Sequence, residues 1–132
     1  MRGEIIVGRL ATGIGQGRHF TRLDWARRQF MEKVGVDPFP GTVNVVVDDA
    51  SSISIWSRLK GEPGVRIVNP NDGPHDCDAR CYRVLIEGRI EAAIVVPEVE
   101  GYAPGLIEMI AAVNVRDALD IADGDVLRFE IR

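Results

Sequence analysis

The sequence predicts a mainly β fold in which a small barrel carries one or two α-helices on its outside. Several short segments alternate apolar and polar residues, as strands with one buried face require, and turn-forming residues separate them. Only one long stretch repeats its apolar residues clearly at helical spacing. Many short strands with one clear helix are typical of small barrels. The 132 residues suffice for one core, and we expect a single domain over residues 1–132.

The N-terminal third is expected to contain a strand and a helix. Residues 4–11 combine β-branched with polar residues and predict the first strand. Four apolar residues at helical spacing predict a helix from Thr21 to Gly35; they are Leu23, Ala26, Phe30 and Val34. Thr21 and Asp24 resemble a capping box at the start of this helix, and Gly35 suits its end.

The rest of the chain is expected to be mostly strands. Residues 42–47 alternate so that three valines share one face while Thr42 and Asn44 share the other; the valines are Val43, Val45 and Val47. Residues 48–80 are rich in Asp, Ser, Pro, Asn and Gly, and predict one or two short strands, "VRIV" among them, and a long exposed loop, "NPNDGPHDCDA". Residues 81–96 predict a hairpin that turns near Gly88.

Three segments complete the chain. The period of "GLIEMIAA" does not distinguish a strand from a short helix, so both alternatives stay open. "VRDALDI" predicts a short helix. "VLRFEI" predicts a closing strand with alternate apolar residues on one face, namely Leu127, Phe129 and Ile131.

Composition excludes several classes of protein. The formal net charge of −4 argues against a partner that is a nucleic acid, which normally needs a basic surplus. No apolar run approaches the roughly 20 residues of a membrane span, and no signal-peptide pattern is present, so we expect a cytoplasmic protein without membrane contact. Lys33 and Lys60 are the only lysines, and any phosphate binding therefore depends on arginine, backbone N–H groups or metal. The oligomeric state stays open, a monomer included.

The stretch "GIGQGRHF" is a candidate anion site. Its three alternate glycines leave the backbone bare just before the predicted helix, and Arg18 and His19 follow. Free N–H groups and an arginine suit phosphate oxygens. The stretch matches neither the dinucleotide-binding nor the P-loop pattern, and a strand-to-helix turn that needs unusual φ angles explains it equally well.

Three further side chains are candidates for chemistry. Alternation places the oxygens of Thr42 and Asn44 on one strand face, where they would suit Mg²⁺ if substrate phosphates completed its shell. Ordinary strand-edge polarity is the alternative. Glu108, inside "LIEMI", either lies on a solvent face or points into a pocket toward a ligand hydroxyl. His75, Cys77 and Cys81 lack the C-x₂-C spacing of a structural zinc site, and we expect reduced thiols.

The order of these motifs resembles the CTP-dependent riboflavin kinases of archaeal type. The resemblance rests on the strand before "GIGQGRHF", the helix, "FPGTVNV", "AAIVVP", "IEMIA" and "LDIADGDVLRFEI". It covers nearly the whole chain and is weakest from Asp48 to Arg80. It implies a cradle-loop β-barrel of about six strands that transfers the γ-phosphate of CTP to the 5′-hydroxyl of riboflavin, giving FMN and CDP.

The resemblance also implies roles for individual residues. Thr42 and Asn44 would hold Mg²⁺, Glu100 and Glu108 would contact the flavin, and Glu108 is the candidate catalytic base. Two segments would bind the nucleotide; they are Ile14, Gly15, Gln16, Gly17, Arg18 and His19 in the glycine loop, and Val113, Asn114, Val115 and Arg116 near the C-terminus.

Two departures from the family pattern keep an alternative open. Glu100 stands where the family often has a threonine, and "AAVNVR" replaces a segment that contains proline and lysine. A flavin- or nucleotide-binding barrel with weak or lost catalysis is therefore the alternative to a kinase. A barrel-based transcriptional regulator is a further one, indicated only by the "DGDVLRFEI" ending.

Overall fold

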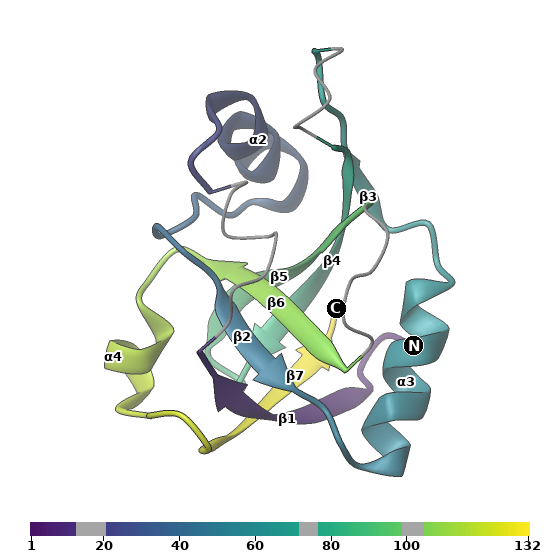
Figure 1. Ribbon diagram of the computed structural model, residues 1–132, viewed down its shortest axis with the longest axis vertical. Helices are drawn as coiled ribbons and strands as arrows, with labels where there is room; N and C mark the ends of the chain where they lie inside the picture. Colours follow the sequence, from purple (N-terminus) through teal and green to yellow (C-terminus); the bar gives the residue numbers. More distant parts are fainter. Residues whose placement is uncertain (13–20, 72–76, 99–104) are drawn as a thin grey trace.

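The computed structural model describes residues 1–12, 21–71, 77–98 and 105–132, and its centre is a closed antiparallel barrel (Figure 1). Each of the six barrel strands pairs with two neighbours in the order β4-β5-β6-β2-β1-β7, and β7 closes the barrel on β4. The strands are β1 (Ile5–Ala11), β2 (Val43–Val46), β4 (Ala79–Ile86), β5 (Ile90–Pro97), β6 (Leu106–Ala111) and β7 (Val126–Ile131). A seventh strand, β3 (Val65–Ile67), pairs with the start of β4. The expected six-stranded barrel is confirmed.

The inside of the barrel is apolar because alternate residues of every strand point inward. Fully buried members of this core include Ile6, Val45, Val84, Ile94, Ile107, Met109, Leu127 and Phe129. The predicted inward faces of residues 42–47 and 126–131 are confirmed. Gly8 allows β1 and β2 to pack closely, since a Cβ there would lie 3.0 Å from the Cβ of Val45 and a larger residue would force its neighbours to shift.

A second apolar layer covers the outside of β4, β5 and β6. It is formed by α2 (Asp24–Gln29) and the π-helix η1 (Phe30–Val34), which lie over one end of the barrel (Figure 1). Ala26, Phe30 and Val34 pack there against residues of the three strands, including Cys81, Ala93, Val95 and Ile110. Strand β5 is therefore buried on both faces, which explains its nearly continuous apolar sequence.

The helix starts later than the sequence predicted. Its N-cap is Leu23, which makes no side-chain capping bond, so the capping box of Thr21 and Asp24 is wrong. Thr21 is buried instead, and its Oγ1 accepts a hydrogen bond from the backbone N–H of Gly41 at 3.2 Å. The predicted stop is confirmed, because Gly35 has a φ of 73° in the left-handed region.

The helix α3 (Ala50–Lys60) was not predicted. Its first turn is capped by Asp49, whose carboxylate accepts the N–H of Ser52 at 2.9 Å, and this bond holds the pKa of Asp49 below its usual value. Ile55, Trp56 and Leu59 face the barrel. The serines and β-branched residues of this segment are weak helix formers, and packing against the barrel overrides that preference.

The remaining expectations are settled by the backbone. Strand β3 forms within "VRIV", and the β4–β5 hairpin turns at Glu87 and Gly88, both with positive φ as a type I′ turn requires. The open segment "GLIEMIAA" forms strand β6, and α4 (Val115–Leu119) is the expected short helix. The described residues thus contain three α-helices and one π-helix, more than the one or two predicted. In this part of the chain no helix is long and apolar enough to cross a membrane.

Ser52 joins α3 to the barrel. Strand β1 pairs with β2 only from Arg9 to Ala11, because β2 ends at Val46, opposite Arg9. The N–H of Val7 lies beyond that pairing and donates instead to the Oγ of Ser52, at 2.9 Å. This hydroxyl is almost completely buried. We therefore infer that this hydroxyl replaces a backbone hydrogen bond that β2 does not make with Val7.

Replacing Ser52 with alanine should lower the free energy of unfolding by about 1–3 kcal/mol, because a part-buried N–H loses its acceptor. Ser54→Ala, on the exposed face of the same helix, is the control and should change it by no more than about 0.5 kcal/mol. Urea denaturation followed by circular dichroism measures both. Equal effects of the two substitutions would contradict this role of Ser52.

Candidate functional site

The start of β2 carries the two predicted metal ligands close together. The Oγ1 of Thr42 donates to the Oδ1 of Asn44 across 3.2 Å, and the amide nitrogen of Asn44 contacts the carbonyl of Thr42 at 3.4 Å. Thr42 is half-buried and Asn44 is buried. Both side chains point away from the barrel core, since Val43 and Val45 on the same strand point into it. The strand therefore presents a pair of oxygens at one place on its outer face.

Glu108 lies directly across from this pair. The register of β2 with β6 places Asn44 opposite Glu108, so their side chains share the outer face of the sheet as cross-strand neighbours. Glu108 is completely buried, and the simpler expectation of a solvent-exposed carboxylate is wrong. A carboxylate is costly to bury, so its place beside two other polar side chains indicates a site rather than ordinary surface polarity.

Two adjoining pockets open around this strand end. An apolar pocket of about 200 Å³ lies between β2 and α4. A polar pocket of about 360 Å³ lies on the other side, and Thr12, Arg22, Thr42, Asn44 and Arg116 are among its lining residues. Pro40, Gly41, Thr42 and Arg116 line both. The two pockets therefore adjoin along these four residues, and together they have an apolar and a polar end.

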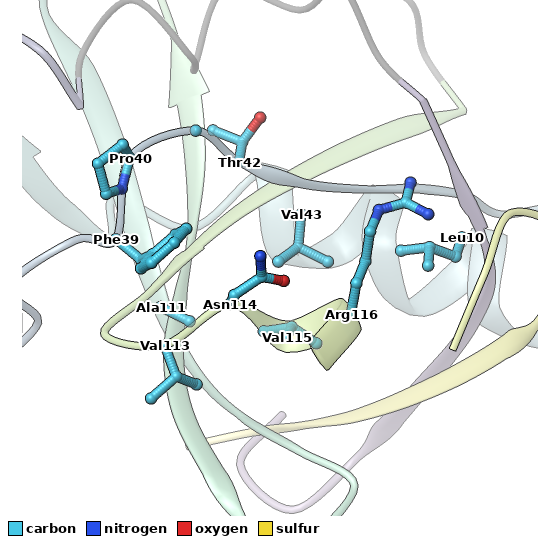
Figure 2. Close-up of a pocket in the computed structure, with 11 residues that line it drawn as sticks. Leu10, Phe39, Pro40, Thr42, Val43, Ala111, Val113, Asn114, Val115 and Arg116 are labelled. Atoms are coloured by element: carbon cyan, nitrogen blue, oxygen red, sulfur yellow. The ribbon is translucent and has the colours of Figure 1, made fainter. Parts of the chain in front are cut away.

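Figure 2 shows the apolar pocket from its side. Val43 and Val115 point toward each other, Phe39 lies beside Ala111 and Val113, and Arg116 extends past Leu10 with its guanidinium beside β2. The backbone N–H of Phe39 donates to the carbonyl of Ala111 at 2.7 Å, which attaches the turn before β2 to the end of β6. Apolar walls of this kind suit the flat ring of an organic ligand.

Asn114 supplies the apolar pocket with a hydrogen-bond donor. Its Oδ1 accepts the N–H of Asp117 at 3.2 Å and so caps α4, which assigns the other end of the carboxamide as the NH₂ group. That group points into the pocket (Figure 2). A ring nitrogen or carbonyl oxygen of a bound ring is the acceptor that it would suit.

Arg116 is held in place by a carboxylate. Its guanidinium bonds to Asp123, at 2.5 Å, and to the carbonyl of Ala11, at 3.4 Å. Asp123 also accepts the hydroxyl of Thr12 at 2.7 Å. The hydrogen bond from Thr12, followed by that from Arg116, lowers the pKa of Asp123. The carboxylate is therefore ionised at neutral pH and fixes Arg116 at the boundary between the pockets.

The oxygen pair fits a hard cation only in part. Neighbouring ligands in an Mg²⁺ octahedron lie about 2.9 Å apart, close to the 3.2 Å between the oxygens of Thr42 and Asn44. Among the described residues, however, no three His, Cys, Asp or Glu side chains gather around a common point. Two neutral oxygens bind such an ion weakly, so phosphates and water would have to fill most of the shell.

The structure brings together only some of the predicted residues. Thr42, Asn44 and Glu108 meet on the β2–β6 face, and four residues of α4 and its approach line the apolar pocket; they are Val113, Asn114, Val115 and Arg116. The predicted residues of the glycine loop, 14–19, and Glu100 lie outside the described residues, as does His75. Cys81 is buried in the layer beneath η1, and burial raises its pKa to about 12.

Sequence reasoning missed two residues of the pockets, Arg22 and Phe39, and also Asp123, which holds Arg116. Arg22 was read as part of a helix, Phe39 as part of a turn, and Asp123 as part of the turn "DGD". Only the position of Phe39 between two prolines, just before "GTVN", marked it as unusual in the sequence. The places of Arg22 and Asp123 in the site follow only from the fold, which brings the ends of β1, β2 and α4 together.

Fold and site together define a closed antiparallel barrel with a two-part pocket at the start of β2. The family model of the CTP-dependent riboflavin kinases, described as "Domain of unknown function DUF120", matches residues 10–131. The chain therefore belongs to this family.

Curated relatives named riboflavin kinase are similar to most of the chain. That of Methanosarcina acetivorans is 44% identical over 119 residues, which is 89% of this chain and 49% of that protein. Those of Pyrobaculum arsenaticum and Ignicoccus hospitalis are both 35% identical, and they cover 96% and 89% of this chain and 60% and 65% of their own lengths. The chain thus spans about half the length of the Methanosarcina protein.

Proposed function

We propose that this chain is a riboflavin kinase that transfers the γ-phosphate of CTP to the 5′-hydroxyl of riboflavin, giving FMN and CDP. Membership of the family and the names of the relatives support the kinase class. The single structural observation that carries the proposal is the pair of adjoining pockets, in which an apolar end meets two arginines and the paired oxygens of Thr42 and Asn44.

The two ends of the pocket suit the two ends of a nucleotide. The apolar end, with Phe39, Val113 and the NH₂ group of Asn114, would hold the cytosine and its sugar. The polar end would hold the phosphates, since arginine presents planar donors that match phosphate oxygens. Arg116 lines both ends and would contact the phosphates nearest the nucleoside.

Phosphoryl transfer depends mainly on positioning and on offsetting negative charge. Thr42 and Asn44 would hold Mg²⁺ together with the phosphates, and the bound ion would offset the charge on the transferred group. Glu108, next to Asn44 on the neighbouring strand, would orient the riboflavin hydroxyl and accept its proton. The hydroxyl oxygen then forms the new bond to the γ-phosphorus while the bond from that phosphorus to the bridging oxygen of CDP breaks.

Incubation of the purified chain with riboflavin, Mg²⁺ and each of the four nucleoside triphosphates tests the activity directly. We expect FMN with CTP and little or none with the others, measured by chromatography with fluorescence detection. Omission of Mg²⁺ should abolish product, because two neutral oxygens cannot replace the ion. Tight binding of riboflavin or CDP without FMN under any condition would contradict the kinase and favour a binding barrel that has lost catalysis.

Glu108→Gln keeps the shape of the side chain and removes its charge and basicity. We expect kcat to fall about 100-fold or more while the KM for CTP changes little, because loss of a general base acts on the chemical step. Glu32→Gln, exposed on η1, is the control and should retain full activity. Thermal unfolding of both variants separates an effect on catalysis from one on folding. An unchanged kcat in Glu108→Gln would leave this residue only a binding role.

A further inference from the structure

Arg22 lines the polar pocket. It precedes α2, whereas Arg116 comes from α4, so the two guanidinium groups approach the pocket from distant parts of the chain. Arg116 also lines the apolar pocket, but Arg22 does not. Of the two ends of the site, Arg22 therefore contacts only the polar one.

The backbone around Arg22 is anchored to the site. The preceding residue, Thr21, is buried, and its hydroxyl accepts the N–H of Gly41, which lines both pockets. This bond attaches the segment before α2 to the turn that leads into Thr42 and Asn44. Arg22 is thus an exposed side chain whose backbone is held beside the predicted metal ligands.

The charges around Arg22 favour binding of an anion. Other exposed arginines, such as Arg27, Arg58 and Arg66, form ion pairs with nearby carboxylates. Arg116 has Asp123. Arg22 forms no ion pair with any residue in the described part of the chain, which is also true of the exposed Arg28. Unlike Arg28, it lines the polar pocket, whose described lining contains no carboxylate. Because Arg116 is already paired with Asp123, Arg22 is the guanidinium group of the described lining whose charge no carboxylate balances, and it therefore attracts an anion.

We propose that Arg22 binds the terminal phosphate of the nucleoside triphosphate, while Arg116 binds the phosphates nearer the nucleoside. This inference rests on the proposed function, because it takes the nucleoside to occupy the apolar end. The contribution of Arg22 to affinity then depends on the number of phosphates, because it contacts the terminal phosphate of a triphosphate and no part of a monophosphate. It also offsets charge on the transferred group on the side away from Arg116.

The test is calorimetric binding of CTP, CMP and inorganic tripolyphosphate, each with Mg²⁺, to the full chain and its variants. Arg22→Ala should weaken CTP and tripolyphosphate roughly 10- to 100-fold, the range for a lost hydrogen bond to a charged group. It should weaken CMP less than about twofold, because a nucleoside monophosphate does not reach Arg22. Arg22→Lys should recover part of the loss, since it keeps the charge without the planar fork.

Arg28→Ala is the matched control, because it removes one exposed arginine of α2 that lines neither pocket. It should leave all three affinities within about twofold, and thermal unfolding should show that each variant is folded. Equal weakening by Arg22→Ala and Arg28→Ala would overturn the proposal and indicate a general charge effect. Equal weakening of CTP and CMP by Arg22→Ala, or no weakening, would overturn it too.

The kinase assay separates this inference from the proposed function. FMN formation by the wild-type chain with unchanged CTP binding in Arg22→Ala would retain the kinase and reject the role of Arg22. Selective loss of tripolyphosphate binding in Arg22→Ala, together with a wild-type chain that makes no FMN, would retain the phosphate site and reject the kinase. A wild-type chain that binds neither CTP nor tripolyphosphate would reject both.

Discussion

The register between β2 and β6 is the constraint on which the whole site depends. With Asn44 opposite Glu108, the polar residues of both strands share the outer face and the apolar ones share the core. A slip of β2 by one residue would turn Asn44 into the barrel and Val45 out of it, which would cost buried apolar contacts and bury a polar side chain in the core. The packing of the core therefore also holds the polar pair in place.

The outer layer explains why such polar residues occur on a barrel wall. Most of the outer face of β4, β5 and β6 is covered by α2 and η1, which makes it a second core. Where that cover ends, the chain passes through Thr21 and Arg22, and the hydroxyl of Thr21 joins it to the turn before β2. The site thus lies at the boundary between a covered and an open sheet face, where a ligand can be both desolvated and reached.

The sequence predicted the barrel well because alternation in its strands is local and strong. It also predicted α4 and the stop at Gly35, because these are local signals too. It missed α3, because serines and β-branched residues are weak helix formers and Asp49 was not recognised as the cap. Strand alternation singled out Thr42 and Asn44, and the family resemblance singled out Arg116. The burial of Glu108 and the part played by Arg22 and Asp123 depend on contacts between residues far apart in the chain, which no local pattern records.

The most direct test of this account locates the metal–nucleotide complex on the barrel. Mn²⁺ in place of Mg²⁺, added with CTP to chain labelled with ¹⁵N, broadens amide signals near the ion. We predict that the amides of residues 41–44 disappear first and that of Arg116 is affected, whereas residues 54–60 of α3, beyond the other end of β2, keep sharp signals. Broadening centred away from the start of β2, in chain shown to bind CTP, would contradict the placement of the phosphates and the metal at this strand.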